Sequence, residues 1–363
     1  MAKENNALAD AFSRINKMYG ANSIMKLSDT PPINENLLST GSLLIDQILG
    51  GGIACGRVAE IYGVESSGKS TLCLQIAAEC QKNGGKVAYI DVENALDVEY
   101  AKHLGVNTDE LIFSQPSSAE QALDIVDILG KTGEVQLIIV DSVAALSPQA
   151  ELDGEMADMT IGLVARILSK ALRKITASIN QSKCAVIFIN QIREKISTGF
   201  GGGYGEQTTT PGGRALKFFA SQRIELRKTT AIKSGADVIG TNVKVKITKN
   251  KIAPPLKVAE VPMIFGEGFS AKDEVIDLAI EYNLIEKSGA WFTLPNGQRL
   301  QGKESVKSYY NVHEDEAAKL REEVVSKLKG VELKPEFVVD PITGEVLEEM
   351  GPRRDPEVSL DIE

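Results

Sequence analysis

The stretch GVESSGKST, residues 63–71, contains the residue types and the spacing of a phosphate-binding loop. Gly63, Gly68, Lys69 and Ser70 match the pattern G-x-x-x-x-G-K-[ST]. Glycines let the backbone curl so that several N–H groups point at one phosphate, which a Cβ would obstruct. The lysine adds a positive charge for the β- and γ-phosphates, and the serine hydroxyl can ligate Mg²⁺. The stretch therefore predicts a nucleotide site.

The residues on either side supply the setting that such a loop needs. Residues 58–62 form a short apolar run typical of a strand, and residues 71–82 have the apolar pattern of a helix. A strand, a glycine-rich turn and a helix in this order place the positive end of the helix dipole on the same anion. The four fixed positions alone recur by chance in about one chain of this length in a hundred. The flanks therefore favour a nucleotide site over a plain glycine-rich turn.

The composition is that of an ordinary globular protein. With 363 residues, 43% of them hydrophobic and 25% charged, the chain is long enough for one large core and a smaller appendage. Its four cysteines have no C-x-x-C spacing, which indicates free thiols in a reducing compartment. The first residues lack the apolar segment of a signal peptide, and no apolar run approaches the ~18 residues of a membrane span. We therefore expect a cytoplasmic protein that does not enter a membrane.

The net charge of −10 is distributed unevenly. Residues 331–363 hold ten acidic and three basic residues, a balance of −7, which leaves −3 for residues 1–330. Residues 190–260 hold thirteen Lys or Arg and five acids, a balance of +8. A basic central block indicates a surface that binds anions, and the acidic tail would be a detachable segment that competes for this surface. The alternative is that the charges are simply scattered over a solvated surface.

Apolar, β-branched runs alternate with helical stretches along the centre of the chain. The runs cover residues 58–62, 86–91, 136–141 and 184–190, and the helical stretches include residues 118–129 and 162–179. Continuous apolar runs are typical of parallel strands that are buried on both faces. We therefore predict an α/β fold with a doubly wound, mainly parallel sheet, whose ligands bind at the carboxyl ends of the strands.

Three polar residues follow predicted strands at that edge of the sheet. Asp141 ends one strand, where P-loop proteins place the acid that orients Mg²⁺, although an Asp before Ser142 can also cap a helix. Glu93 lies two residues beyond another strand, where a carboxylate can polarise an attacking water or simply face solvent. Gln191 follows the last of the four runs. These positions predict the rest of the nucleotide site.

Two segments have the composition of mobile binding loops. Residues 154–162 precede a basic helix, and residues 195–213 are rich in Gly and Thr. Such a composition cannot pack a core, but it can order around a polyanion and donate hydrogen bonds to its phosphates. A simple linker is the alternative for the second segment. The basic and aromatic side chains in these regions are Arg166, Lys170, Arg173, Lys174, Phe200 and Tyr204.

The chain divides into four parts. Residues 1–34 contain one helix, over residues 3–20, whose single apolar stripe must dock on the protein's own core or on another copy. Residues 35–269 form the nucleotide-binding core, and residues 270–330 form a smaller unit with two helices and a small sheet. Residues 331–363 combine many acids with four prolines, and we expect them to be disordered.

Two lysines end an alternating strand pattern in VKVKITKNK, residues 243–251. With a period of two, Lys249 and Lys251 share the phase of the apolar residues Val243 and Val245. Burying two unpaired cations is costly, so that both must meet an anion or water.

Six motifs taken together resemble the RecA family of bacterial homologous-recombination ATPases. They are GVESSGKST (63–71), YIDVENALD (89–97), IIVDSVAAL (138–146), FINQIR (188–193), TTTPGGRALKFFAS (208–221) and KNKIA (249–253). The similarity runs from about residue 3 to residue 330 and keeps the order of the motifs. It implies a RecA-like fold with an N-terminal polymerisation helix and a small α+β C-terminal domain.

The resemblance also implies roles at an ATP site. The residues that would contact ATP are Gly63, Glu65, Ser66, Ser67, Gly68, Lys69, Ser70 and Thr71, with Asp97 and Tyr100 at the adenine. Ser70 would ligate Mg²⁺ and Asp141 would hold the hydration shell of the metal. Glu93 would be the general base for the attacking water.

Two further implied roles connect the nucleotide to other parts of a filament. Gln191 would sense the γ-phosphate and pass that state to the loop at residues 195–213. Lys249 and Lys251 would reach the nucleotide of the neighbouring subunit. ATP would then be bound at subunit interfaces of a helical homopolymer.

For nucleic acid, the resemblance implies that residues 154–162 and 195–213 are DNA-binding loops. Ile161 and Ile196 would be apolar wedges between base triplets. The residues that would touch the DNA backbone are Ser169, Arg173, Gly212, Gly213 and Arg214. The filament would form on single-stranded DNA and catalyse pairing and strand exchange with double-stranded DNA. A self-cleaving repressor of the DNA-damage response and a single-strand-binding protein would be its partners.

The sequence departs from the family pattern at a few positions. Asn94 stands where the family usually has His, and Ser70 replaces the commoner Thr. The second loop has extra glycines within residues 199–205 and a proline, Pro211, before its paired glycines. These changes leave the ATPase interpretation intact and bear on DNA kinetics and on repressor cleavage.

Two other classes of protein share this kind of core. A hexameric helicase or clock-type ATPase would lack the two loops and the C-terminal unit. A nucleotide-gated polymer without a DNA function would hydrolyse ATP at a rate indifferent to DNA. A transporter ATPase of the ABC type is excluded by the lack of an L-S-G-G-Q motif.

Overall fold

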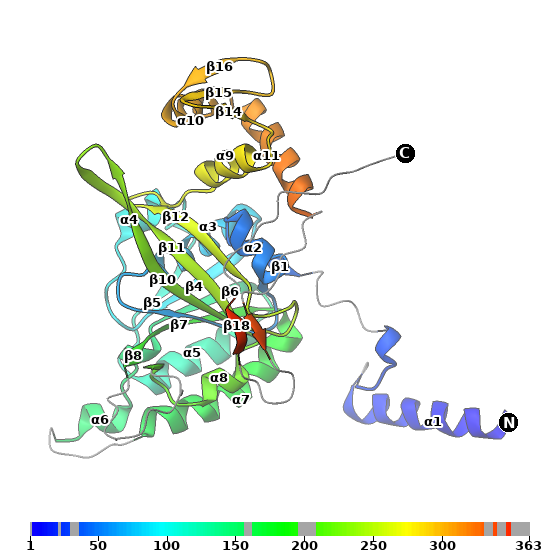
Figure 1. The fold of residues 1–363 in the computed structure, drawn as a ribbon. Helices are drawn as coiled ribbons and strands as arrows, with labels where there is room; N and C mark the ends of the chain where they lie inside the picture. Colours follow the sequence, from blue (N-terminus) through cyan, green and yellow to red (C-terminus); the bar gives the residue numbers. More distant parts are fainter. Residues whose placement is uncertain are drawn as a thin grey trace. The chain divides into compact units, whose positions relative to one another are not determined.

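The computed structural model describes residues 2–20, 23–29, 36–155, 162–194, 208–329, 337–339 and 346–349. The chain separates into two compact units, residues 1–36 and 37–363, which are described one at a time (Figure 1). Among the helices of the described ranges, none is long and apolar enough to cross a membrane.

The first unit contains one long helix, α1, which spans Ala2–Tyr19. The predicted helix over residues 3–20 is therefore confirmed. Gly20 ends it with a φ of +105°, and the chain folds back so that the backbone N–H of Ile24 donates to the side chain of Asn16 at 3.2 Å. Leu8 and Tyr19 on the apolar stripe are 62% and 73% exposed.

The second unit is built on a nine-stranded sheet with the order β13-β12-β11-β10-β3-β7-β6-β4-β5. The strands from β10 to β5 run parallel to one another, and β11, β12 and β13 are antiparallel. The parallel strands are β3 Val58–Gly63, β4 Lys86–Asp91, β5 Ile112–Ser114, β6 Val135–Asp141, β7 Ala185–Gln191 and β10 Gln222–Ser234. The antiparallel strands are β11 Asp237–Asn250, β12 Val258–Ile264 and β13 Gly268–Phe269. The predicted mainly parallel sheet is confirmed.

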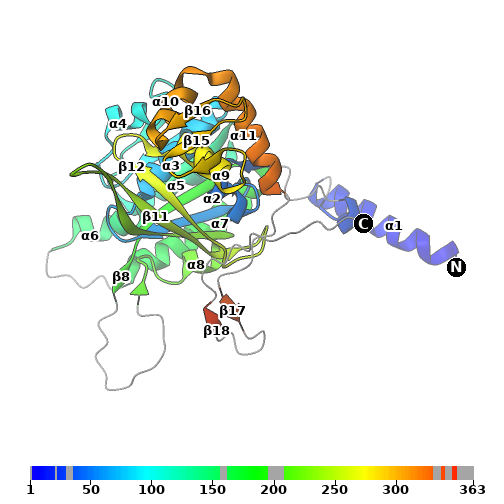
Figure 2. The same ribbon diagram turned by 45° about the horizontal axis from the view of Figure 1, so that its top comes forward.

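Helices cover both faces of the sheet (Figures 1 and 2). One face carries α2 Leu43–Leu49, α3 Lys69–Lys82 and α4 Val98–His103, and the other carries α5 Ala119–Lys131, α7 Leu163–Ser182 and α8 Ala215–Phe219. In β7 the two faces alternate, because Ile187 and Ile189 join the first core while Val186 and Phe188 join the second. Both sets are at most 1% exposed, which explains why the strand reads as an unbroken apolar run.

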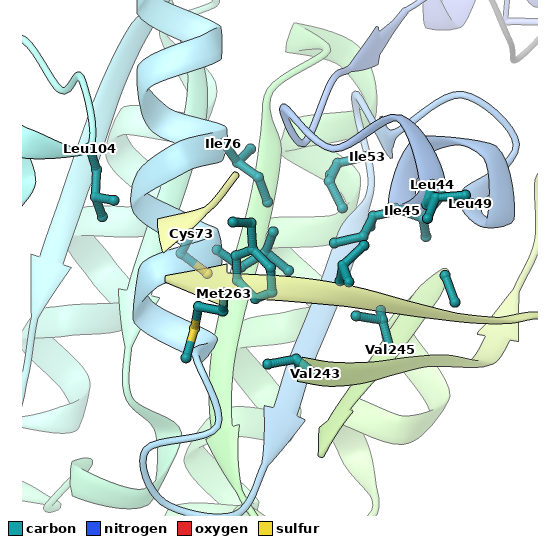
Figure 3. Close-up of a cluster of buried hydrophobic side chains, with 14 of the residues drawn as sticks. Leu44, Ile45, Leu49, Ile53, Cys73, Ile76, Leu104, Val243, Val245 and Met263 are labelled. Atoms are coloured by element: carbon teal, nitrogen blue, oxygen red, sulfur yellow. The ribbon is translucent and has the colours of Figure 1, made fainter. Parts of the chain in front are cut away.

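Figure 3 shows part of the first core, where side chains from α2, α3, β11 and β12 converge. Ile45, Ile76 and Val245 are fully buried there. Each such side chain stabilises the fold by about 1.5–3 kcal/mol relative to an exposed position. This packing fixes helix α3, and with it the first residue after the glycine-rich loop.

Shorter elements complete the core. They are the 3₁₀ helices η1 Leu27–Asp29 and η3 Val143–Ala145, helix α6 Gln149–Asp153, and the strand pairs β1 Leu37–Leu38 with β2 Ile53–Ala54 and β8 Arg193–Glu194 with β9 Thr208–Thr209. The β8–β9 pair joins the two sides of residues 195–207, which themselves lie outside the described ranges.

Residues 271–329 form a small α+β domain (Figure 1). Its elements are α9 Ala271–Glu281, β14 Glu286–Ser288, β15 Trp291–Thr293, β16 Arg299–Gln301, α10 Lys303–Val312 and α11 Glu314–Lys329. Its three strands form an antiparallel sheet. Val275, Val306 and Val324 are buried in the same apolar cluster as the core of the large sheet, so the domain packs directly on it. Helix α10 was not among the predicted elements.

A buried carboxylate fastens this domain to the large core. Glu274 of α9 accepts hydrogen bonds from the Ser42 hydroxyl at 3.1 Å, from the Leu43 N–H at 3.2 Å and from the Leu44 N–H at the start of α2. Burial raises the pKa of Glu274 from 4.5 to about 7, although these three donors favour the charged form and oppose the rise. The negative charge of Asp46 on α2 adds to the rise in the pKa of Glu274.

We predict that Glu274→Gln will alter how stability depends on pH. The folded protein holds the proton of Glu274 more tightly than the unfolded chain does, so its contribution is complete below about pH 4.5 and is lost as the pH rises to about 7. Across this range the wild type should lose up to about 3 kcal/mol of unfolding free energy relative to the variant. Urea unfolding of both proteins between pH 4.5 and 8 measures the difference. A difference that stays constant over that range contradicts the prediction.

Part of the C-terminal tail has regular structure. Residues 331–363 were expected to be disordered, but β17 Phe337–Val339 pairs with β18 Val346–Glu349 as antiparallel strands. The expectation is therefore wrong for these residues. Consecutive aromatic and β-branched residues at 337–339 favour a strand even within an acidic segment.

Candidate functional site

The glycine-rich loop joins the end of β3 to the start of α3, as its sequence predicts. At two of its glycines a side chain would have no room. A Cβ on Gly63 would lie 2.3 Å from the carbonyl oxygen of Leu226, and one on Gly68 would lie 2.6 Å from the Met263 sulfur. Gly68 also has a φ of +90°, which disfavours any other residue. Both glycines are therefore required by the fold of the loop itself.

Lys69 is the first residue of α3 and is buried, and its Nζ donates to the Val64 carbonyl inside the loop at 2.8 Å. Burial lowers the pKa of Lys69, and the negative charges of Asp141 and Glu93 oppose that shift. The N-terminus of α3 has no side-chain cap, because Gly68 stands at the capping position. A cation and uncapped N–H groups at one place form a site that fits a phosphate.

A buried hydroxyl in the same loop adds to this fit. The Ser67 Oγ is fully buried and finds no hydrogen-bond partner among the residues that the structure describes. Buried polar atoms are rarely left unpaired unless a ligand, an ion or water satisfies them. The loop thus has the donor set that a nucleotide phosphate needs.

A hydroxyl and a carboxylate meet beside the loop. The Ser70 Oγ donates to the Asp141 Oδ2 at 2.8 Å, and the Tyr89 hydroxyl donates to the same oxygen at 2.6 Å. Burial raises the pKa of Asp141, and these two hydrogen bonds oppose the rise. Oxygen ligands next to a phosphate site suit Mg²⁺, which neutralises phosphate charge when it is bound. The sequence predicted Ser70 and Asp141 but not Tyr89.

Glu93 lies on the same edge of the sheet. The Ser142 hydroxyl donates to its Oε1, and the Gln191 Nε2 donates to the same oxygen at 3.4 Å. The structure therefore brings together Glu93, Ser142 and Gln191. Glu93 follows the end of β4, Ser142 follows the end of β6, and Gln191 ends β7. An exposed carboxylate held by a hydroxyl and an amide is placed to accept a proton from water. Ser142 was considered in the sequence only as a helix position.

The two residues expected at the adenine lie on or next to α4. The Tyr100 hydroxyl is 3.0 Å from the Thr71 Oγ1, so that it borders the first turn of α3. Asp97 caps α4 by accepting the N–H groups of Glu99 at 2.9 Å and Tyr100 at 3.1 Å. Tyr100 is thus next to the phosphate loop, and the adenine contact of Asp97 stays a prediction.

Lys249 and Lys251 lie toward the amino-terminal ends of the parallel strands, whereas the phosphate loop follows the carboxyl end of β3. Lys249 pairs with Arg223 in the register of β10 and β11, and Arg223 pairs with Glu60 near the start of β3. The phosphate loop begins at the other end of β3. Lys249 donates through Nζ to the carbonyls of Lys217 at 2.7 Å and Phe218 at 3.1 Å in α8. Its pKa is lowered by partial burial and then by the charges of Lys251 and Arg223.

The predicted alternation of this strand is wrong beyond Ile247. The register shifts between Ile247 and Lys249, which leaves Thr248 as an extra residue in β11, and β11 ends at Asn250. Lys249 is therefore half-buried, and Lys251 is exposed beyond the strand, instead of both continuing the apolar phase. A bulge cannot be read from a strand pattern, because it depends on the partner strand.

The expected DNA-binding residues are only partly described. Ile161, Ile196 and Phe200 lie outside the described residues, as do most of the loops at 154–162 and 195–213. On α7 the apolar face is buried, through Leu168, Leu172, Ile175 and Ile179, and Arg166 and Arg173 are exposed on the other side, with Ser169 between them half-buried.

The paired glycines close the second loop against the same helix. A Cβ on Gly213 would lie 2.9 Å from the Ala165 Cβ of α7, and one on Gly212 would lie 2.8 Å from a methyl of Val143. Both glycines have positive φ, of +73° and +82°. Arg214, which follows them, is exposed. The end of the second loop and the start of α7 therefore form one continuous region.

The parallel sheet and the loop before α3 define the chain as a P-loop nucleotide-binding protein. Residues 6–270 match the RecA N-terminal domain, and residues 273–329 match the RecA C-terminal domain. The chain belongs to the RecA family, a family of recombinases with a nucleotide-binding core. The resemblance read from the sequence motifs is confirmed.

Curated relatives cover almost the whole chain. Protein RecA of Thioalkalivibrio sulfidiphilus is 49% identical over 88% of this chain and 93% of its own length. Protein RecA of Rickettsia massiliae is 49% identical over 90% of this chain and 95% of its own length. Protein RecA of Nitratidesulfovibrio vulgaris is 50% identical over 92% of both. The solved RadB recombinase is 25% identical, with a TM-score of 0.47 over 64% of this chain and 98% of its own.

Proposed function

We propose that this protein is a DNA-dependent ATPase that forms helical filaments on single-stranded DNA and catalyses homologous pairing and strand exchange. The observation that carries the proposal is the division of the ATP machinery between two edges of one sheet. Lys69, Asp141, Glu93 and Gln191 lie at one edge, whereas Lys249 lies at the other. Such a chain completes its site only when a neighbour supplies the missing edge. Head-to-tail interfaces of this kind generate helical filaments.

Each residue has a chemical role in this proposal. Lys69 and the N–H groups of the phosphate loop bind the phosphates, and Ser70 and Asp141 hold the metal. Magnesium, when it is bound, neutralises charge on the β- and γ-phosphate oxygens. Glu93 takes a proton from the attacking water. The lysine pair of the neighbour stabilises the charge that develops on the γ-phosphate.

Gln191 connects this chemistry to DNA. It contacts Glu93 and ends β7. Strand β8 begins two residues later and leads into the second loop. In the proposal, a change at Gln191 on loss of the γ-phosphate reaches the loop through this short path. The exposed basic residues of α7, with Arg214, would bind the phosphates of single-stranded or double-stranded DNA.

Further expectations follow from the resemblance to the RecA family, to which the chain belongs. They are a cytoplasmic location, an interplay with single-strand-binding protein, and activation of a self-cleaving repressor in the DNA-damage response. The exposed stripe of α1 would dock on a second copy in the filament.

The rate of ATP hydrolysis with and without single-stranded DNA tests the proposal. We expect stimulation of at least about tenfold, because the DNA lines up each phosphate loop with the lysine pair of a neighbour. Equal rates would overturn the DNA-dependent activity and favour a nucleotide-gated polymer.

We predict that Glu93→Gln will bind ATP but hydrolyse it about 100-fold more slowly or worse, since an amide cannot accept the proton. Glu99→Gln is the matched control, because Glu99 is an exposed acid on α4 whose side chain pairs with Lys102. Single-turnover hydrolysis on single-stranded DNA gives the comparison. Normal turnover by Glu93→Gln would reduce Glu93 to a surface acid.

A further inference from the structure

A buried carboxylate lies behind Glu93 and is absent from the roles described so far. Asp91 ends β4 and is 2% exposed. Its Oδ1 accepts the N–H of Ala95 at 3.3 Å, and its Oδ2 accepts the N–H of Leu96 at 3.2 Å and the side-chain amide of Gln115 at 3.1 Å. One side chain thus gathers three donors from two separate segments of the chain.

The start of the same turn is hydrogen-bonded to the end of β6. The N–H groups of Val92 and Glu93 both donate to the carbonyl of Asp141, at 2.7 Å and 3.2 Å. Between the two fastenings the chain reverses at Asn94, whose φ is +54°, a conformation that asparagine tolerates better than most residues. The turn at residues 92–96 is therefore held at its start by a carbonyl and at its end by the Asp91 carboxylate.

Little else fixes the direction of Glu93. Its side chain is exposed, so that packing does not hold it, and among the described residues it accepts hydrogen bonds from the Ser142 hydroxyl and the Gln191 amide. Both contacts require the Glu93 backbone to stay where the turn places it. Catalytic groups that are displaced by about 1 Å can lose on the order of 100-fold in rate. The anchor of the turn therefore bears directly on the chemistry.

We propose that Asp91 is a positioning residue for Glu93, which it holds toward the γ-phosphate by anchoring the turn at residues 92–96. The inference rests on the proposed role of Glu93 as the general base. Asp91 acts through the turn, because its oxygens accept hydrogen bonds from the backbone of the turn and from Gln115. Asp91→Asn keeps the size of the side chain but turns an NH₂ group toward N–H donors, so that at least one of the three hydrogen bonds is lost.

The first test measures the turn itself, without nucleotide. In Asp91→Asn, the amide hydrogens of Ala95 and Leu96 should exchange with solvent at least about tenfold faster, while those of the buried strand β7 keep their protection. Asp127→Asn is the matched control, since Asp127 is also a buried carboxylate that accepts side-chain hydrogen bonds, from Lys131 and Ser178. It should leave Ala95 and Leu96 unchanged. Unchanged exchange in Asp91→Asn would overturn the proposal.

The second test measures the chemistry and its route. Asp91→Asn should lower the single-turnover rate on single-stranded DNA about tenfold or more, with ATP affinity within about threefold of the wild type. If Asp91 acts only through Glu93, the double variant with Glu93→Gln should be no slower than Glu93→Gln alone. A further loss in the double variant would mean that Asp91 acts by another route, and the proposal would fail.

The outcomes separate this inference from the proposed function. Full turnover by Asp91→Asn overturns the inference alone, whereas full turnover by Glu93→Gln overturns the base assignment and the inference together. Should Asp91→Asn fail to fold, Gln115→Ala removes one donor and leaves the carboxylate in place. It should slow hydrolysis a few-fold and speed the exchange of Leu96, again without effect in the Glu93→Gln background. Wild-type exchange and turnover in Gln115→Ala would then count against the anchor.

Discussion

Lys69→Ala is expected to abolish ATP turnover while leaving the folded protein as stable as the wild type. The ammonium is buried and donates to the Val64 carbonyl of the loop, and burial lowers its pKa. In the absence of a nucleotide this charge is held at a cost, so that its removal should not destabilise the fold. With ATP bound, the loss of the cation from the proposed phosphate site should reduce hydrolysis by at least about 100-fold.

Thermal unfolding with and without magnesium and ATP separates the two effects. The wild type should unfold at a higher temperature when nucleotide is present, and Lys69→Ala should not, because only a ligand that binds the folded state raises stability. Lys82→Ala provides the control, since Lys82 lies at the other end of the same helix with a side chain that is 75% exposed. DNA-stimulated hydrolysis retained by Lys69→Ala would disprove the phosphate assignment.

The central strands could be predicted because each is buried on both faces. The run at residues 86–91 coincides with β4. The runs at 58–62 and 136–141 differ from β3 and β6 by one residue at one end, and the run at 184–190 is displaced from β7 by one residue. Their apolar character needs no knowledge of neighbours, because helices cover both sides.

The antiparallel strands have a different character, and among them only the end of β11, within residues 243–251, was predicted as a strand. In β11 the buried residues Val243, Val245 and Ile247 alternate with half-buried Lys244 and Lys246. Such a strand is amphipathic, and the sequence does not say which strand it pairs with. The edge strand β5 is largely exposed and only three residues long, so that its pattern is too short to detect.

The residues of the site differ in the same way: some can be predicted from the local sequence, and others only from the pairing of strands. Glycines, Lys69 and Ser70 are consecutive in sequence, and their spacing alone identifies the loop. Tyr89 meets Asp141 only through the register of β4 against β6, and Asp91 meets Gln115, which follows β5, only through the pairing of β4 with β5. Contacts between distant strands of this kind follow from the sheet, which the sequence order does not specify.

The second large effect is expected from mixing two inactive variants. Lys249→Ala/Lys251→Ala keeps its own phosphate loop, and Lys69→Ala keeps its own lysine pair. Each alone should lack DNA-stimulated hydrolysis. Within one chain the lysine pair and the phosphate loop lie at opposite ends of β3, so that the pair cannot serve its own loop. Mixed on one DNA strand, a double-lysine subunit can receive the lysines of an adjacent Lys69→Ala subunit.

The dependence on the mixing ratio makes this test quantitative. With random assembly, an active interface needs one subunit of each kind in a fixed order, so that activity should peak at equal amounts, at about a quarter of the wild-type rate. Lys249 also donates to two carbonyls of α8, and restored activity in the mixture would show that the double-lysine subunit still has a folded, working phosphate loop. A mixture of Lys69→Ala with the triple variant has no intact phosphate loop and should stay at baseline. If co-filaments form and the first mixture also stays at baseline at every ratio, the lysines do not act on a neighbour's nucleotide.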